Sequence, residues 1–296
     1  MYGIKEYNRK LKSLNNTRKI TNTMKMVSAS KLRKAHRAQA NAKLYAREVT
    51  FLTSRIAAAA RDSLHPLLVP QAKIQKALIV IITSDKGLCG AFNHNAHRHV
   101  LSWLKENHQK YSQIDLSCCG KKGFQFFRKR MTIKTHYEEV TEKPQFLNAM
   151  RIGDDLTRFY LKGEYDEVYI AYNQFFNPLS QKTVFEKILP IESRGLINQA
   201  PTDMISQMLR PTDYIFEPDP HETLNFLIPH FLYFKVYFAL LENSAGEHGA
   251  RMSAMDNATK NASDIIDRYT LFRNRARQEQ ITKELIEITA GREALE

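Results

Sequence analysis

The stretch KALIVIITSDKGLCGAFN, residues 76–93, contains an unbroken apolar run, then a polar turn with glycines, then the start of a helical pattern. A short apolar run bounded by turn residues is typical of a strand that is buried on both faces of a parallel sheet. A strand, a glycine turn and a helix is also an arrangement in which many proteins bind phosphate. The stretch therefore predicts the first strand of an α/β domain, with a nucleotide site as one interpretation of its turn.

The turn contains neither of the common phosphate-binding motifs. In a Walker loop Lys and Ser/Thr follow the last glycine, but here Lys86 precedes Gly87 and no such pair follows. A dinucleotide fingerprint needs GxGxxG and an acidic residue about 20 positions later, but the glycines are spaced GxxG and Asp115 lies at the wrong distance. Asp85, the glycines and a helix-capping Asn93 suit an ordinary strand-to-helix connection. We expect a packing or subunit-contact turn and no bound cofactor.

Residues 73–220 alternate between strand-like and helix-like segments around this turn. The later strand-like segments are IDLSCC, EVYIAYNQF and KTVFEKILPI, and the helix-like ones are NAHRHVLSWLKEN, GFQFFRKR and FLNAMRIGDDLTRFYLKG. This alternation predicts a small Rossmann-like α/β domain with a largely parallel sheet. Residues 190–222 are rich in proline and polar residues and predict a loop and edge-strand region that leads to the last helix.

Both ends of the chain show the alternating three- and four-residue spacing of a coiled-coil seam. At the C-terminal end the seam residues are Met255, Ala258, Ala262, Ile265, Tyr269, Phe272 and Ala276. The N-terminal seam has two phases, the first with Ile4, Tyr7, Leu11 and Leu14 and the second with Ala35, Ala38, Ala42, Tyr45, Val49, Leu52 and Ile56. Between these phases Met24, Val27 and Leu32 carry the apolar face less regularly, and such a change alters the supercoil locally.

The two seams predict a long antiparallel coiled coil of the two terminal helices. The N-terminal helix would occupy residues 1–62 and the C-terminal helix region residues 221–296, with Gly246 and Gly249 near the start of its heptad pattern. The most apolar window, residues 224–241, has polar breaks, so it predicts a buried helix pair kinked at Pro229 rather than a membrane span.

The net charge of +13 is concentrated at the N-terminus, because residues 1–50 contain 13 Lys/Arg and 2 Glu. A segment of this kind should meet nucleic acid, an anionic membrane surface or an acidic protein surface. There is no apolar secretory segment at the N-terminus, so we expect no signal peptide.

Residues that could act as nucleophiles or metal ligands form no recognisable site. The three cysteines do not form a disulfide framework or a metal-ligand pattern, which favours a reducing compartment. Cys89 is better explained as a small buried side chain than as a nucleophile. His94, His97 and His99 do not share a helix face, which favours a solvated helix start over a metal site.

Four motifs resemble those of one family, the gamma subunits of F-type ATP synthases. KITNTMKMVSASKLRKA, SDKGLCGAFN, EHGARMSAM and ITKELIEITAGREA are similar to the family's motifs and occur in the same order across nearly the whole chain. Arg292 departs from the pattern, because the family has Ala at that position.

The resemblance implies an antiparallel coiled coil inside a ring of alpha and beta subunits, with the α/β domain outside the ring near the epsilon subunit and the c-ring. The chain would be the central rotor shaft that couples ion flow to ATP synthesis or hydrolysis, without bond chemistry of its own. It would be a peripheral membrane protein on the cytoplasmic face of a bacterial cell membrane. The matched positions imply coupling roles for Met24, Arg251, Gln278, Thr282 and Glu287. A basic coiled-coil nucleic-acid-binding protein is the alternative interpretation.

Overall fold

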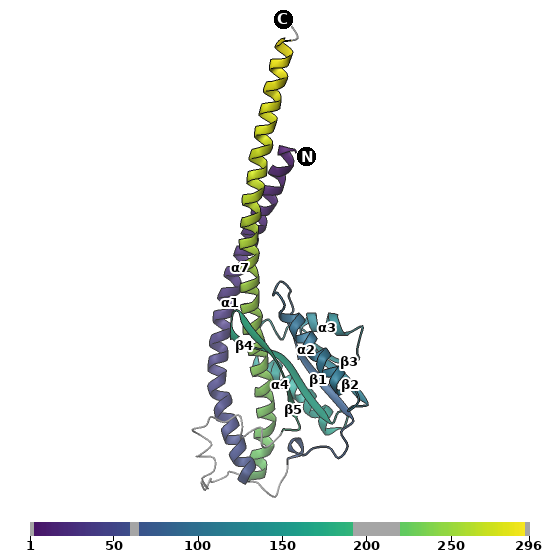
Figure 1. The fold of residues 1–296 in the computed structure, drawn as a ribbon. Helices are drawn as coiled ribbons and strands as arrows, with labels where there is room; N and C mark the ends of the chain where they lie inside the picture. Colours follow the sequence, from purple (N-terminus) through teal and green to yellow (C-terminus); the bar gives the residue numbers. More distant parts are fainter. Residues whose placement is uncertain (1–2, 60–64, 192–219, 294–296) are drawn as a thin grey trace. The chain divides into compact units, whose positions relative to one another are not determined.

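The computed structural model describes residues 3–59, 65–191 and 220–293, and Figure 1 shows the arrangement of the elements. The helical elements are α1 (Ile4–Ala59), the 3-10 helix η1 (Pro66–Leu68), α2 (Phe92–Asn107), α3 (Lys121–Phe127), α4 (Phe146–Leu161) and α7 (Pro220–Glu293). The strands are β1 (Lys76–Ile82), β2 (Gln113–Cys119), β3 (Ile133–Tyr137), β4 (Glu167–Asn177) and β5 (Ser180–Leu189).

The five strands form one sheet in the order β3-β2-β1-β4-β5. β1 pairs in parallel with β2 and β4, and β2 pairs in parallel with β3, whereas β5 returns antiparallel to β4. The predicted Rossmann-like domain with a largely parallel sheet is thereby confirmed. Strand β3 was not predicted from the sequence, because IKTHY lacks the continuous apolar run that marks the buried strands.

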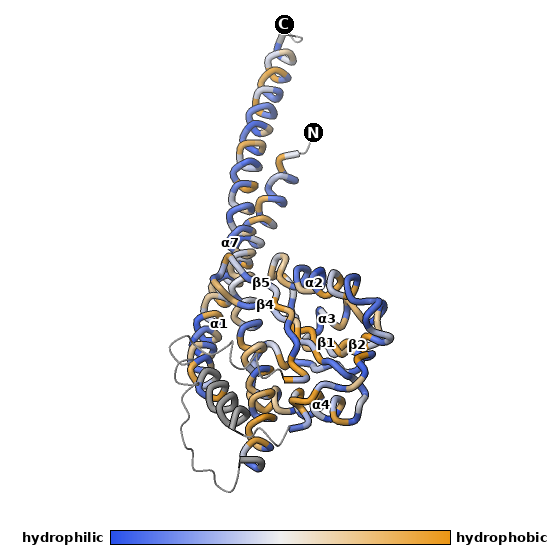
Figure 2. The backbone as a smooth tube through the Cα atoms, turned by 60° about the horizontal axis from the view of Figure 1, so that its bottom comes forward, coloured by the Kyte–Doolittle hydropathy of each residue, from blue (hydrophilic) through white to orange (hydrophobic). Residues whose placement is uncertain are grey.

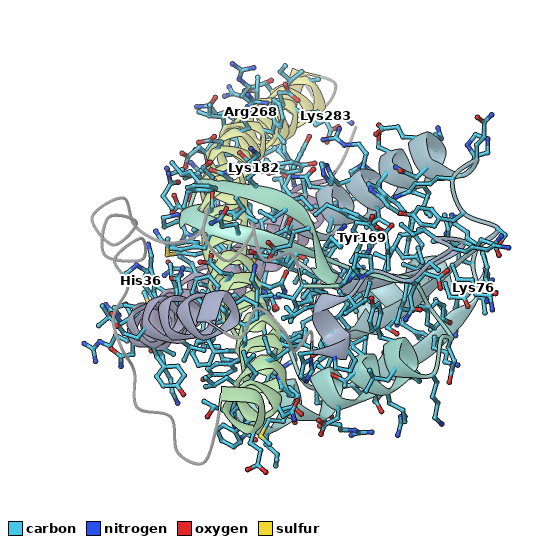
Figure 3. The ribbon with its side chains drawn as sticks, turned by 90° about the horizontal axis from the view of Figure 1, so that it is seen from below. His36, Lys76, Tyr169, Lys182, Arg268 and Lys283 are labelled. Carbon is cyan, nitrogen blue, oxygen red and sulfur yellow. The ribbon has the colours of Figure 1, made fainter. Side chains whose placement is uncertain are left out.

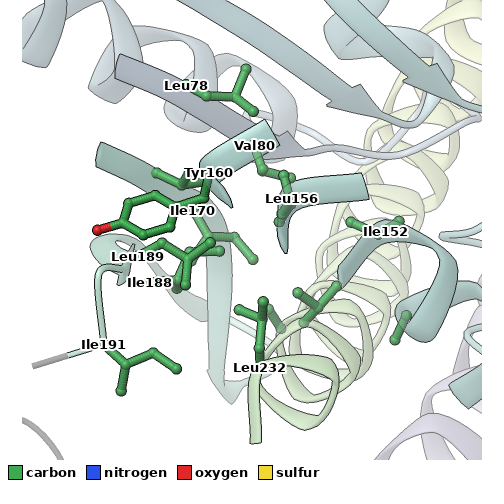
Figure 4. Packing of buried hydrophobic residues seen from close by; sticks show 14 of the residues in the cluster. Leu78, Val80, Ile152, Leu156, Tyr160, Ile170, Ile188, Leu189, Ile191 and Leu232 are labelled. Carbon is green, nitrogen blue, oxygen red and sulfur yellow. The ribbon is translucent and has the colours of Figure 1, made fainter. Parts of the chain in front are cut away.

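β1 lies at the centre of this sheet and contributes to the core on both of its faces. Leu78, Val80 and Ile82 pack with α4 and the first turns of α7. Ile79 and Ile81 point to the other face, where α2 and α3 cover the sheet. Successive side chains of a strand point to opposite faces, so the unbroken run ALIVII fills both. Figure 4 shows the α4 and α7 side of this packing around Leu78, Ile152 and Leu232.

The chain divides into two compact units. One is Ala29–Ala250 and contains the sheet and its helices. The other consists of Met1–Ser28 and Arg251–Glu296. The helices α1 and α7 each contribute to both units.

The C-terminal helix α7 is one helix from Pro220 to Glu293, so the predicted helix pair is wrong. Pro229 lies inside it, between Ile228 and Leu232, whose buried side chains belong to the sheet-facing core. A proline removes only one helical hydrogen bond, and the packing of its neighbours keeps the helix continuous. In the described part of the chain α7 alone is long and apolar enough to cross a membrane, and half of its most apolar window is buried inside the protein.

Gly246 and Gly249 lie inside α7, and one histidine of α2 differs from its predicted setting. His97 is buried, stacked on Phe126 with ring centroids 4.3 Å apart, so the prediction of a solvated helix start fails for this residue. Burial lowers the pKa of His97 to about 4. All three cysteines are buried, which agrees with the predicted filler role of Cys89.

Candidate functional site

The turn after β1 is held in place by its own polar side chains. The backbone N–H of Ser84 donates to Asn93 Oδ1 at 2.9 Å, and Asn93 Nδ2 donates to Ser84 Oγ at 2.7 Å. Asn93 is therefore not the predicted helix cap. The N-cap position is Ala91, and the Asn93 side chain instead joins the first turn of α2 to the end of β1. This contact is favourable because it satisfies buried polar groups on both elements.

The same turn is joined to the start of α3. Asp85 accepts hydrogen bonds from the backbone N–H of Lys121 at 3.0 Å and from Thr141 Oγ1 at 2.8 Å. Thr83 Oγ1 accepts from the backbone N–H of Gly123 at 2.8 Å. Two N–H groups at the start of α3 thus bond to the protein itself, and a carboxylate stands where an anion would have to bind. Within the described residues no group of three potential metal ligands occurs. The arrangement agrees with a packing turn.

A three-membered ion cluster fastens the turn to α1. Glu142 Oε1 lies 2.8 Å from Lys86 Nζ and 2.9 Å from Lys31 Nζ. The hydrogen bonds from Lys86 and Lys31 lower the pKa of Glu142 to about 2. Sequence reasoning missed this cluster, since 56 positions separate Lys86 from Glu142 and 111 separate Lys31 from Glu142.

Leu88 is a second feature of the turn that the sequence did not reveal. Its φ of +63° lies in the left-handed region, which is uncommon for a residue other than glycine. Its side chain is 62% exposed. The turn therefore holds an apolar side chain in solvent at a backbone cost, an arrangement that is found more often at functional positions than elsewhere.

The unit formed by Met1–Ser28 and Arg251–Glu296 is an antiparallel helix pair. Lys25 Nζ contacts Asp256 Oδ1 at 2.6 Å, and Thr259 Oγ1 donates to Thr21 Oγ1 at 2.8 Å. Further along, the rings of Tyr7 and Tyr269 lie 6.2 Å apart. Residues with lower numbers on α1 thus pair with residues of higher numbers on α7, so the two helices run in opposite directions. The predicted antiparallel coiled coil is confirmed.

The seam of this helix pair differs from the predicted one at two places. On α1, Ser28 is buried whereas Val27 is 50% exposed. On α7, Ile266 is buried whereas Ile265 is 38% exposed. Small polar side chains fit a closely spaced seam, so a buried serine can replace the apolar residue that the pattern predicts.

The five predicted coupling residues all belong to this unit but lie at separate levels of it. Met24 is half-buried next to the Lys25–Asp256 ion pair, and Arg251 is buried five residues before Asp256. The other three are exposed near the end of α7, namely Gln278, Thr282 and Glu287. The structure therefore places the last three on one exposed segment of α7 but does not bring the five together in one cluster.

The last part of α7, residues 277–292, is exposed at every position. It extends beyond the N-terminal end of α1 in Figure 1. It nevertheless carries large apolar side chains, with Ile281 49%, Leu285 58% and Ile288 69% exposed. Figure 2 shows hydrophobic and hydrophilic residues interleaved along this end of the helix. Exposed apolar side chains that recur along one segment are typical of a surface that binds another protein.

Comparison with known proteins places these features in one family. The family model described as ATP synthase matches residues 3–295. The ATP synthase gamma chain of Pelotomaculum thermopropionicum is 42% identical over the whole of both chains. That of Trichlorobacter lovleyi is 38% identical over 100% of this chain and 99% of its own.

Solved structures give the same result for the fold. A chain in the central stalk and c-ring structure of the Tetrahymena thermophila mitochondrial ATP synthase matches with a TM-score of 0.57 and 27% identity. This match covers 81% of this chain and 99% of that one. A chain of the Euglena gracilis enzyme matches with a TM-score of 0.64 at 18% identity and covers 99% of this chain and 94% of that one.

Proposed function

Because this chain belongs to the ATP synthase gamma chain family and is a central rotor shaft, we propose that it turns inside a ring of alpha and beta subunits. In this proposal the epsilon subunit and the c-ring attach to it outside the ring. The observation that carries the proposal is the family match over nearly the full length of the chain. The chain would associate with the cytoplasmic face of a bacterial membrane through the complex.

The exposed end of α7 supports this placement. Covering the half-exposed isoleucine and leucine side chains of this segment with a partner is favourable, because it removes apolar surface from water. Its apolar residues are interspersed with charged ones, so its contact with the surrounding ring of alpha and beta subunits would be partly apolar and partly polar. A shaft that rotates needs such a moderate contact, because a large apolar patch would hold it in one orientation.

The basic residues 1–50, which include most of α1, support contact with acidic loops of the beta subunits. The excess of 11 positive charges in residues 1–50 gives long-range attraction that weakens as salt increases. A nucleic-acid partner, the alternative from the same charge, finds no support among the related proteins. Nucleotide chemistry would belong to the partner subunits, since the turn after β1 uses its polar groups internally.

We assign the coupling of shaft orientation to the catalytic ring to Met24, Arg251, Gln278, Thr282 and Glu287. Met24 is half-exposed and lies in the basic segment, so it can contact the acidic loops. The exposed end of α7 carries Gln278, Thr282 and Glu287, and the ring of alpha and beta subunits would surround them there. The turn after β1 would present Leu88 to a partner subunit.

The substitution Met24→Lys tests this assignment, because it adds a positive charge beside the acidic loops and alters the contact in one rotational state more than in others. We expect fewer protons pumped per ATP hydrolysed by membrane vesicles, with an unchanged amount of assembled complex. Met26→Lys is the matched control, since residues two positions apart on a helix do not share a face. An unchanged pumping ratio in the Met24→Lys variant would refute the coupling role of this residue.

A further inference from the structure

One segment of α7, residues 241–249, is buried on every face although half of it is polar. A helix that is buried all round is normally apolar. Here the buried side chains include Glu242, Asn243 and Ser244. Burying such groups is unfavourable unless each has a hydrogen-bond partner. Four other elements of the unit Ala29–Ala250 surround the segment, namely α1, α2, β4 and β5, and the hydrogen bonds to Glu242 and Asn243 come from α1 and β4.

Glycines let these elements approach α7 closely. A Cβ atom on Gly246 would lie 3.0 Å from the Phe92 ring of α2. A Cβ atom on Gly249 would lie 3.1 Å from the Phe175 ring of β4 and 3.2 Å from the backbone of Pro178. The two glycines therefore remove the side chains that would keep α2 and the β4–β5 hairpin away from the helix.

The carboxylate of Glu242 joins α7 to two of these elements at once. Oε1 accepts a hydrogen bond from Gln39 Nε2 of α1 at 2.7 Å. Oε2 accepts one from the backbone N–H of Phe175 in β4, also at 2.7 Å. Glu242 is only 3% exposed, so the loss of either partner would leave a buried polar group unsatisfied. Figure 3, which looks along the molecule from below, labels His36 on α1, whose ring lies 6.0 Å from that of Phe175.

Asn243 and Asn173 extend the network to α2 and β5. Asn243 Oδ1 accepts from the backbone N–H of Asn173 at 3.4 Å. Asn173 Nδ2 donates to the carbonyl of Phe92 at 3.1 Å, and Thr183 Oγ1 donates to Asn173 Oδ1 at 2.7 Å. We call the five residues Gln39, Asn173, Phe175, Glu242 and Asn243 the polar clasp.

We propose that the polar clasp is the torsion-bearing joint of the rotor, which keeps the α1 and α7 segments within the unit Ala29–Ala250 from turning against the α/β sheet. The proposal rests on the rotor function proposed above. The hydrophobic effect is non-directional, so apolar contacts define the rotational setting of a helix less sharply than hydrogen bonds do. Hydrogen bonds depend steeply on angle, and those of Glu242 point in different directions from one helical turn. Rotation of α7 about its own axis would therefore break buried bonds rather than exchange contacts.

Single-molecule rotation of the assembled alpha–beta–gamma complex tests the proposal. A bead is attached through Gln125→Cys, at the exposed position of α3, since the native cysteines are buried, and the angular spread of the bead is recorded during the pauses between steps. Glu242→Leu removes both bonds of the carboxylate, and Gln39→Leu removes only the bond to α1. In Glu242→Gln the new amide oxygen can still accept from the backbone N–H of Phe175. If the Gln39 amide rotates by 180°, its oxygen can accept from the new NH2 group, so both contacts persist. Ile152→Ala is the control for general destabilisation, because it opens a cavity in the core away from the clasp.

We expect Glu242→Leu to increase the angular variance at least about twofold, because two directional buried bonds are lost. Gln39→Leu should increase it less, and Glu242→Gln and Ile152→Ala should leave it unchanged although Ile152→Ala lowers the unfolding temperature. If Glu242→Leu does not assemble, a broader distribution with Gln39→Leu supports the clasp and an unchanged one overturns it. Equal broadening by Ile152→Ala also overturns it. If the wild-type chain neither assembles with alpha and beta subunits nor rotates, the rotor function fails instead.

Discussion

Two segments of the same helix, α7, reverse the usual relation between residue type and burial. Residues 241–249, LENSAGEHG, are largely polar or small, yet all are buried. Residues 281–288, ITKELIEI, contain four large apolar side chains, yet all are exposed. The first segment is surrounded by four elements of its own chain, whereas the second has no partner helix among the described residues. We infer from the contrast that the first segment serves internal attachment, and we propose that the second serves attachment to other chains.

The largest expected effect comes from removing the apolar surface of the exposed segment. The triple substitution Ile281→Gln, Leu285→Gln and Ile288→Gln should weaken binding to the alpha–beta ring by about 4 kcal/mol, or about a thousandfold, if each side chain is buried in the complex. Titration of the labelled chain against purified ring subunits measures this loss.

The same triple variant should leave the free chain about as stable as wild type, because these side chains are exposed and belong to none of the buried clusters. Glu284→Gln serves as the control, since it changes a polar residue of the same segment and should bind normally. A triple variant that binds with wild-type affinity would show that the exposed isoleucine and leucine residues do not form the ring-binding surface.

A matched pair of glycine substitutions tests the other half of the contrast. Gly246→Leu places a side chain where even a Cβ atom would lie 3.0 Å from the Phe92 ring. A Cβ atom added to Gly291, in contrast, would have no atom within 4 Å. We expect Gly246→Leu to lower the free energy of unfolding by about 2–3 kcal/mol through overpacking. Gly291→Leu should leave it unchanged or slightly higher, because leucine is the better helix former. Equal unfolding temperatures for the two variants would contradict close packing around residues 241–249.

The sequence was sufficient to predict the elements that rest on periodicity. The run ALIVII indicated a central strand, and the three- and four-residue spacing indicated two seam-forming helices, because burial on both faces or on one stripe imposes these patterns. Periodicity failed where other forces decide. Pro229 did not break α7, since the buried side chains around it hold the helix in place. IKTHY forms the edge strand β3 through pairing with β2.

The parts of the site that could not be predicted depend on residues far apart in the chain. Glu142 reaches Lys31 and Lys86, and Glu242 reaches Gln39 and Phe175, across separations that no local pattern records. The coupling residues were assigned by resemblance of motifs. The exposure of Ile281, Leu285 and Ile288 could not be predicted either, because apolar residues at helical spacing also occur in buried seams.

The smallest expected effect compares two ion pairs, one from each region of the molecule. Glu142 bridges Lys86 of the turn and Lys31 of α1, whereas Glu287 pairs with Lys283 on the same exposed helix at 3.7 Å. Glu142→Gln should lower the free energy of unfolding by about 1 kcal/mol or less at neutral pH, because solvent screens a partly exposed pair. Glu287→Gln should change it less, since an exposed pair within one helix contributes only about 0.3–0.5 kcal/mol.

Acid titration distinguishes the Glu142 cluster from a general surface effect. The pKa of Glu142 is lowered to about 2 from a model-compound value of 4.5, so its stabilising contribution is complete above pH 4.5 and is lost as the pH falls towards 2. The stability difference between wild type and Glu142→Gln should therefore shrink over that interval, as measured by urea unfolding at a series of pH values. A difference that stays constant down to pH 2 would mean that the glutamine acts through packing, and that the turn is not fastened to α1 by charge.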